Sequence, residues 1–304
     1  MEKSSPSLRR AWWALLLLSV IWGYNWVVMK VALRDAGTFD FAALRTALGA
    51  LSLFVVLAWR RAPLAPRNVR GAALLGLLQT SAFIGLTVWA VDVGGAGRTA
   101  VLVYTMPFWV LVLAWPILGE RIRGLQWLAV ALAFAGLMSI LEPWQLHGEL
   151  LSKVLAVVAG IAWAASVIVA KKLHIRGGAE LLSLTAWQML LGAVPLVVAA
   201  LLVPSAPIHW TGSFIAALLY NIIPANAVAW LLWLYVLNRL SAGLASLGML
   251  ATPVLGVLAA WAQLGERPGA LEALGMLLIG VALALFSYHS VQQHRRVNAA
   301  MAQE

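Results

Sequence analysis

Long apolar stretches without charged side chains recur along the whole chain, and they constrain its fold more than any other feature. A helix needs about 20 apolar residues to cross a hydrocarbon core of roughly 30 Å, since each residue adds about 1.5 Å. Ten stretches approach this length, and the second carries an internal charge, Arg45. They are Ala11–Met29, Phe41–Trp59, Gly71–Val91, Thr99–Gly119, Gly124–Leu141, Val154–Ala170, Leu181–Val203, Thr211–Leu237, Leu240–Gly265 and Ala273–His294. The sequence therefore predicts an all-α integral membrane protein with ten transmembrane helices.

The composition supports a protein that lies in lipid. Hydrophobic residues make up 63% of the chain and charged residues 11%, whereas soluble proteins carry about 25% charge. The net charge of +10 does not indicate a nucleic-acid partner, because Lys and Arg lie in the short gaps between apolar stretches. Cysteine is absent, which excludes a disulfide, a thiolate nucleophile and a sulfur-ligated metal.

The positions of Lys and Arg predict the orientation. One set of alternating gaps holds fifteen of them and the other set holds five. Because positive charge favours the cytoplasmic side, we expect both termini in the cytoplasm. The first apolar stretch exceeds the core of a signal peptide, which holds about 7–15 residues, so we expect it to remain as a helix.

Two segments of the chain resemble each other at an offset of five spans. The segment 99–121 and the segment 245–267 both contain a proline, Pro107 and Pro253, and both end in Gly-Glu-Arg. Five is an odd number, so the second half is expected to enter the membrane in the opposite direction, as in many secondary transporters. The expected units are a first five-helix repeat over 1–145, an inverted second repeat over 146–290, and a cytoplasmic tail over 291–304.

These features resemble the EamA-type branch of the drug/metabolite transporter superfamily. The resemblance is carried by the paired Pro…Gly-Glu-Arg segments, the ten spans and the run Asp40-Phe41-Ala42-Ala43-Leu44-Arg45 at the start of the second span. The length and the many tryptophans are most similar to the aromatic amino acid exporters of bacterial inner membranes. The resemblance thus implies a bacterial inner-membrane exporter whose substrates are aromatic and other hydrophobic neutral amino acids.

The polar residues do not favour an enzyme. The five histidines lie in gaps or at span ends, and no Asp or Glu lies near the centre of a span. A hydrolytic dyad or a metal cluster needs titratable groups close together, so we expect no catalytic residue, no metal and no cofactor. A carboxylate at mid-membrane usually marks a proton or cation site, and its absence favours neutral or zwitterionic cargo.

Aromatic and amide side chains occupy the middle of the spans instead. Trp22 and Trp163 lie at equivalent positions of the two repeats, and a buried indole needs a partner for its N–H. Residues three positions later can share the same helix face. The expected substrate-binding residues are Trp22, Asn25, Gln79, Thr80, Tyr104, Trp163, Ser166, Asn226 and Trp230. Packing between helices and interhelical hydrogen bonds remain the alternative for each of them.

Other residues are assigned to movement and to helix ends. Bending is expected at Pro107, at Pro253 and in the link that contains Gly95 and Gly97. Arg45 could hold a substrate carboxylate. It lies about four residues from the predicted helix end, however, so its long side chain is expected to reach the outer interface. Structural ion pairs or helix ends are predicted for Arg45, Glu120, Arg121, Glu266 and Arg267.

The expected mechanism is alternating access through a central, uncharged cavity lined by helices 1, 3, 4, 6, 8 and 9. The partners are the lipid bilayer and an amino acid substrate, and a monomer is expected to suffice for transport. One alternative is the export of another neutral metabolite or a drug-like compound. A second alternative, from a different class, is a membrane scaffold or sensor that transports nothing.

Overall fold

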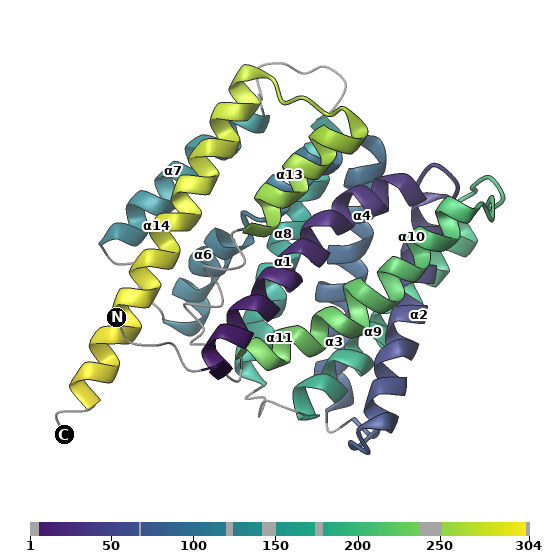
Figure 1. The fold of residues 1–304 in the computed structure, drawn as a ribbon, viewed down its shortest axis with the longest axis horizontal. Helices are drawn as coiled ribbons and strands as arrows, with labels where there is room; N and C mark the ends of the chain where they lie inside the picture. Colours follow the sequence, from purple (N-terminus) through teal and green to yellow (C-terminus); the bar gives the residue numbers. More distant parts are fainter. Residues whose placement is uncertain are drawn as a thin grey trace.

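The computed structural model describes residues 6–66, 68–119, 124–141, 150–173, 179–237 and 251–301, and every regular element within them is a helix. Figure 1 shows their arrangement in a single bundle. The elements are α1 (Pro6–Ala32), α2 (Thr38–Trp59), α3 (Val69–Leu75), η1 (Gly76–Ala82), α4 (Phe83–Val93), α5 (Ala96–Val103), α6 (Met106–Leu118), α7 (Leu125–Leu141), α8 (Leu150–Lys172), α9 (Ala179–Leu202), α10 (Gly212–Ile222), η2 (Ile223–Val228), α11 (Ala229–Leu237), α13 (Ala251–Leu264) and α14 (Ala270–Met301).

Seven predicted spans are confirmed as helical segments long and apolar enough to cross a membrane, counted over the described residues. They are Arg10–Ala32, Thr38–Trp59, Val69–Val93, Ala96–Leu118, Leu150–Ala170, Leu181–Leu202 and Gly212–Trp233. Shorter apolar helices at Leu125–Ser139, Thr252–Leu264 and Ala270–Leu285 coincide with the other three. The count of ten spans therefore stays a prediction.

Three of the spans are not continuous α-helices, which the apolar pattern did not predict. The third passes through the π-helical turn η1, and the eighth passes through the π-helical turn η2, which has Pro224 in its first turn. The fourth is divided between α5 and α6 at Tyr104 and Thr105, and Pro107 follows in the first turn of α6. A proline has no backbone N–H to donate, so the start of a helical segment tolerates it best.

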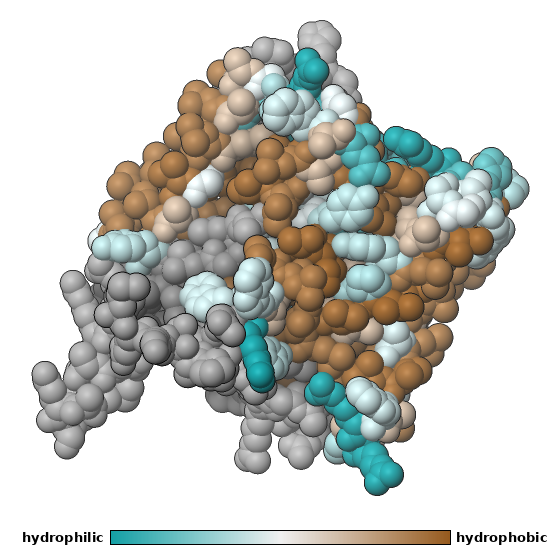
Figure 2. Space-filling model, in the orientation of Figure 1, coloured by the Kyte–Doolittle hydropathy of each residue, from teal (hydrophilic) through white to brown (hydrophobic). Residues whose placement is uncertain are grey.

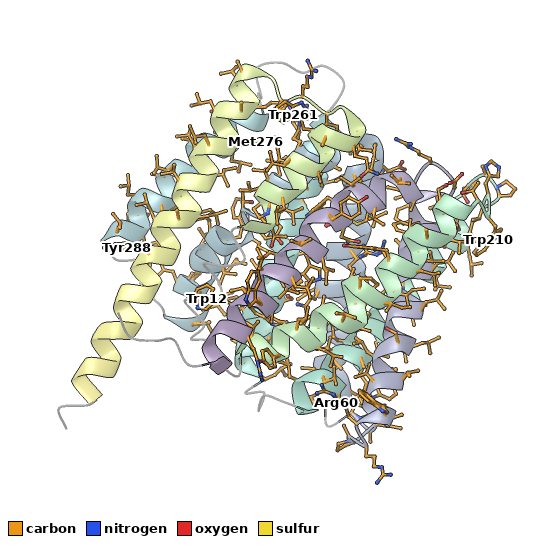
Figure 3. The ribbon with its side chains drawn as sticks, in the orientation of Figure 1. Trp12, Arg60, Trp210, Trp261, Met276 and Tyr288 are labelled. Atoms are coloured by element: carbon orange, nitrogen blue, oxygen red, sulfur yellow. The ribbon has the colours of Figure 1, made fainter. Side chains whose placement is uncertain are left out.

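Apolar side chains cover the outside of the bundle, as lipid requires. Figure 2 shows a broad brown surface over its middle, and Leu201 and Val55 are 80% and 68% exposed. Exposed Trp12, Trp210 and Trp261 project from the ribbon in Figure 3. Aromatic rings of this kind are enriched where a membrane meets water. The apolar surface is thus consistent with an integral membrane protein.

Pairs of helices that are distant in sequence pack along the bundle. Helix α14 lies beside α7, α2 beside α9 and α1 beside α13 (Figure 1). Helix α1 begins and α14 ends toward the same lower side of this view. The repeated glycines have one backbone conformation: Gly119 after α6 and Gly265 after α13 have φ of 70° and 71°. This left-handed conformation ends a helix and favours glycine, which explains why both copies of the Gly-Glu-Arg motif begin with it.

Candidate functional site

A cavity of about 380 Å³ lies between the helices, and most of the predicted binding residues line it. Small-molecule sites typically enclose about 300–1,000 Å³. Of the nine residues predicted to bind substrate, eight border the cavity: Trp22, Asn25, Gln79, Thr80, Tyr104, Trp163, Asn226 and Trp230. Both halves of the chain thus contribute to one cavity.

Ser166 is the ninth residue, and it does not line the cavity. Its side chain is buried, and its hydroxyl donates to the backbone oxygen of Trp163 over 2.6 Å. A serine hydroxyl within a helix often bonds back to a carbonyl of the preceding turn. The expectation that Ser166 faces the cavity with Trp163 is therefore wrong, because the short side chain is held against its own helix.

The two π-helical turns place amide side chains and a backbone carbonyl at the cavity. In η2, the Asn226 side-chain amide donates to the backbone oxygen of Asn221, 2.8 Å away. The backbone oxygen of Ala225 accepts the indole N–H of Trp22 over 3.0 Å. The indole of α1 thus has a polar partner on a segment two hundred residues later in the chain. π-Helical turns are rare and often occur at functional sites, because they widen the helix and release backbone groups.

In η1, the Thr80 hydroxyl donates to the side-chain oxygen of Gln188 over 2.9 Å, which joins η1 to α9. Ser81, next in the chain, donates to the backbone oxygen of Gly192 over 2.7 Å. Gln188 also borders the cavity, although it is not among the residues predicted to bind substrate. The sequence feature that selected Gln79, an amide within an apolar stretch, is also present at Gln188.

Aromatic rings form much of the cavity wall. The Trp22 ring lies 6.3 Å from that of Trp230 and 6.4 Å from that of Trp233, measured between centroids. On another side, the Phe83 and Trp163 rings lie 4.8 Å apart. Such separations are typical of attractive aromatic pairs. The wall therefore presents flat apolar surfaces to whatever occupies the cavity.

The lining differs in part from the expected set of helices. Helices α2, α9 and α14 contribute, through Arg45, through Gln188 with Met189, and through Leu283, whereas no described residue of α13 borders the cavity. Residues without any sequence signal, such as Met29 and Met189, also line it. Methionine fills irregular space and adapts to different ligands. In an apolar span, the sequence does not indicate whether an apolar residue faces the cavity or the lipid.

Arg45 occupies a different place from the one expected. Helix α2 begins at Thr38, so Arg45 lies seven residues, or about 10 Å, into the helix rather than near its end. Its side chain is 9% exposed and borders the cavity. The expectation that it reaches the outer interface is wrong, because the helix starts earlier than the apolar pattern indicated and neighbouring helices enclose the side chain. Among the described lining residues, Arg45 has the one formally charged side chain, so the expectation of an uncharged cavity is wrong.

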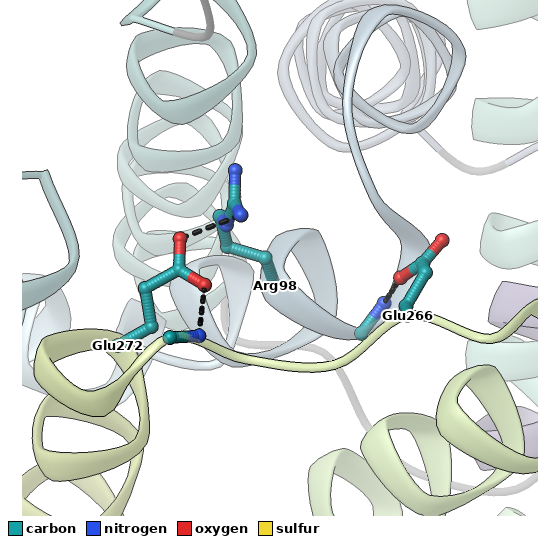
Figure 4. Close-up of polar contacts among 5 residues, drawn as sticks. Arg98, Glu266 and Glu272 are labelled. Carbon is teal, nitrogen blue, oxygen red and sulfur yellow. Dashed lines mark hydrogen bonds and ion pairs between the residues drawn. The ribbon is translucent and has the colours of Figure 1, made fainter.

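Glu266 binds the link that contains the predicted bending residues Gly95 and Gly97, at one end of the bundle. The two carboxylate oxygens of Glu266 accept the backbone N–H groups of Ala96 and Gly97, each over 2.9 Å, and Figure 4 draws one of these bonds. The charge thus lies at the N-terminus of α5, where the helix dipole favours an anion. Glu266 therefore joins the end of α13 to the start of α5.

Further polar contacts gather at this same end. Lys30 donates to the backbone oxygens of Val91, Asp92 and Gly94, each over 2.7 Å, and so completes the end of α4. Arg98 of α5 pairs with Glu272 of α14 at 2.6 Å (Figure 4). A second cavity of about 360 Å³ lies there, between Lys30, Asp92 and Glu266 among others. These contacts hold α1, α4, α5, α13 and α14 together at this end.

The other residues assigned to helix ends and bending are only partly described. Pro253 is buried near the start of the described part of α13. Arg267 is exposed. Glu120 and Arg121 lie outside the described residues, so their predicted role stays a prediction.

Replacing Glu266 by glutamine is expected to lower the stability of the protein in detergent by about 1–2 kcal/mol, because one of two charge-assisted acceptors at the α5 N-terminus is lost. Thermal unfolding of the purified variant measures this. Arg267→Gln, one residue later and exposed, is the matched control and should unfold like the unchanged protein. Equal unfolding temperatures for both variants would contradict the role given to Glu266.

The comparisons with known proteins concern the family and the fold. The sequence model that describes the EamA-like transporter family matches residues 9–141 and, a second time, residues 150–288. A relative from Escherichia coli strain K12 named as a probable amino-acid metabolite efflux pump is 30% identical, over 87% of this chain and 90% of its own length. The uncharacterized transporter YoaV of Bacillus subtilis is 29% identical, over 90% of this chain and 96% of its own.

Two further likenesses bear on the location and on the fold. The uncharacterized inner membrane transporter YedA of Escherichia coli strain K12 is 26% identical over 89% of each chain. A solved structure described as "Crystal structure of protein" covers 94% of this chain and 99% of its own, with a TM-score of 0.64 at 15% identity. This last likeness concerns the fold alone.

Proposed function

The chain belongs to the EamA-like transporter family, and we propose that it exports aromatic and other hydrophobic neutral amino acids across the bacterial inner membrane. Its relatives are named as transporters or efflux pumps, so the prediction that the protein is not an enzyme is confirmed. The observation that carries the proposed substrate class is the lining of the central cavity, which combines aromatic rings with amide and hydroxyl groups.

The chemistry of this lining suits an amino acid with a flat or bulky apolar side chain. The rings of Trp22, Trp163 and Trp230 stack on the apolar body. The amides of Asn25, Gln79 and Asn226 hydrogen-bond the polar end, and the electron-rich ring faces attract an ammonium group. The E. coli relative named as an amino-acid metabolite efflux pump supports the same class.

Alternating access follows from the proposed organisation in two inverted five-helix repeats, 1–145 and 146–290, with both termini in the cytoplasm. The double match of the family model supports the duplication. Rocking about Pro107, Pro253 and the Gly95–Gly97 link would release the Glu266 contacts at one end and close the other. The substrate then stays near mid-membrane while access changes around it.

Transport by purified protein in liposomes tests the proposal. Vesicles loaded with unlabelled L-phenylalanine are expected to take up labelled L-phenylalanine by exchange well above empty vesicles, and L-tryptophan and L-leucine should compete. Exchange at the level of protein-free vesicles would contradict the proposal. Competition by unrelated neutral metabolites or drug-like compounds, without competition by amino acids, would favour the alternative substrate class. An assay with and without a pH gradient shows whether protons are coupled.

The same assay separates a transporter from a scaffold or sensor. Asn226→Leu replaces an amide at the cavity by an apolar side chain of similar size, and removes its hydrogen bond to the backbone of Asn221. We expect exchange to fall about tenfold, because the substrate loses a hydrogen bond that contributes roughly 1.4 kcal/mol to its binding free energy. Expression of the protein should not change. A protein that only serves as a scaffold would show no exchange before or after the change.

A further inference from the structure

The guanidinium of Arg45 lies at the central cavity with few acceptors around it. Its Nη1 donates to the sulfur of Met29 over 3.2 Å, and its Cζ lies 5.9 Å from the centre of the Phe41 ring. Its buried Nε has no hydrogen-bond partner among the described residues. A thioether is a weak acceptor, and a guanidinium carries five N–H donors. Most of the hydrogen-bonding capacity of Arg45 is therefore unused.

A buried cation of this kind is costly when it serves no purpose in the fold. Charged side chains inside the membrane are rare, and they usually pair with one another or mark the path of a substrate. No Asp or Glu is found among the described residues that border the cavity. The arginine therefore has no fixed counter-charge at the cavity, and an anion that enters the cavity supplies one.

Neighbouring groups make the same corner of the cavity polar. Asn25, one turn before Met29 on α1, has a buried side-chain oxygen without a partner. Gly49, one turn after Arg45, brings α2 so close to η2 that a Cβ atom there would collide with the Asn226 amide. Two amides from different helices thus border the cavity together with the guanidinium, and no acidic group of the described lining does.

We propose that Arg45 binds the carboxylate of the transported molecule, and that this carboxylate, rather than the ammonium group, is what the site requires. The inference rests on the proposed function and defines its substrate class more closely. An arginine fork binds a carboxylate through two parallel hydrogen bonds, which adds orientation to charge attraction. Aromatic and hydrophobic monocarboxylates without an amino group are then ligands of the same cavity, because no acidic side chain of the described lining selects for the ammonium.

Three ligands that differ by one group test this requirement on the purified protein. L-Phenylalanine has both charged groups, 3-phenylpropionate lacks the ammonium, and L-phenylalanine amide lacks the carboxylate. Isothermal titration calorimetry should show L-phenylalanine and 3-phenylpropionate binding with affinities within about tenfold of each other. The amide should bind about 30-fold more weakly or worse, which is the loss expected when a buried charge pair loses one partner.

Variants of Arg45 then assign the effect to this side chain. Arg45→Met keeps the length without the charge, and its affinity for 3-phenylpropionate should fall about 30-fold or more while its affinity for the amide stays the same or rises. Arg45→Lys keeps the charge without the fork and should lose less. Arg60→Met is the matched control, because Arg60 is the exposed C-cap of the same helix, and it should bind like the unchanged protein.

The outcomes separate this inference from the proposed function. Equal binding of L-phenylalanine and its amide, or unchanged binding of 3-phenylpropionate by Arg45→Met, would overturn the inference while amino acid exchange still stands. Binding of L-phenylalanine without binding of 3-phenylpropionate would overturn the claim that the ammonium is dispensable. If none of the three ligands binds and liposomes exchange no amino acid, both proposals are wrong. The comparison of ligands on the unchanged protein decides the question even if a variant fails to fold.

Discussion

Replacing Trp163 by alanine is expected to reduce the affinity for L-tryptophan about 30-fold while the protein remains folded. Truncating a tryptophan at the centre of a binding site typically costs at least about 2 kcal/mol, and every 1.4 kcal/mol is a factor of ten. Trp163 lines the cavity, and its ring lies 4.8 Å from that of Phe83. Without it, the substrate loses one of the flat walls that Phe83 and Trp163 form together.

The transport assay in liposomes measures this effect as a rise in KM. Trp163 suits the test better than Trp22, because the Trp22 indole also holds η2 through its hydrogen bond to Ala225 and its loss would disturb the fold. Trp59→Ala is the matched control, since Trp59 is 79% exposed at the end of α2, and its KM should not change. Equal KM values for the two variants would show that Trp163 does not contact the substrate.

A second large effect is expected from adding a single methyl group where two helices touch. At Gly192 on α9, a Cβ atom would collide with the backbone oxygen of Gly76 and with the side chain of Thr80 on η1. Gly192→Ala is therefore expected to destabilise the protein by about 1–3 kcal/mol, since backbone atoms cannot move aside as a flexible side chain does. It should also weaken substrate binding, because Thr80 and Gln188 meet at this crossing and both line the cavity.

Replacing glycine by alanine where the added methyl group meets no other atom should leave the stability unchanged or raise it. A Cβ atom at Gly280 on α14 would meet no atom within 4 Å. Alanine forms helices better than glycine by up to about 1 kcal/mol, so Gly280→Ala should unfold at the same or a higher temperature. Thermal unfolding of both variants in detergent checks the pair. An equal change in both would mean that α9 and η1 do not approach as closely as described.

The sequence predicted the helices better than their interruptions. Spans could be found because charge-free stretches of sufficient length are rare outside membranes. The π-helical turn η1 contacts α9 at Gly192, and η2 contacts α1 through the Trp22 indole. No local pattern encodes such distant partners. The starting residue of α2 shows the same limit, because an error of one turn there placed Arg45 at the wrong depth.

For the cavity, polarity within apolar spans was an effective guide. Asn25, Gln79 and Asn226 were found because an amide at that depth needs a polar surrounding. Met29 and Met189 could not be found in this way, because their chemistry matches the lipid as well as the cavity. Ser166 shows the converse error, since a hydroxyl, unlike an amide, can satisfy itself on its own helix.

Labelling of a single cysteine from either side of the membrane tests most directly whether the cavity opens to the two faces in turn. The chain contains no cysteine, so Thr87→Cys, a small change at a cavity-lining position, introduces the one reactive thiol. A water-soluble maleimide that does not cross membranes is applied to right-side-out and to inside-out vesicles. Val55→Cys, on the apolar outer surface of α2 and 68% exposed, is the control that should stay unlabelled in both. If access alternates, Thr87→Cys is labelled from both sides and L-phenylalanine protects it, whereas a thiol that reacts from one side alone, or from neither, would contradict alternating access.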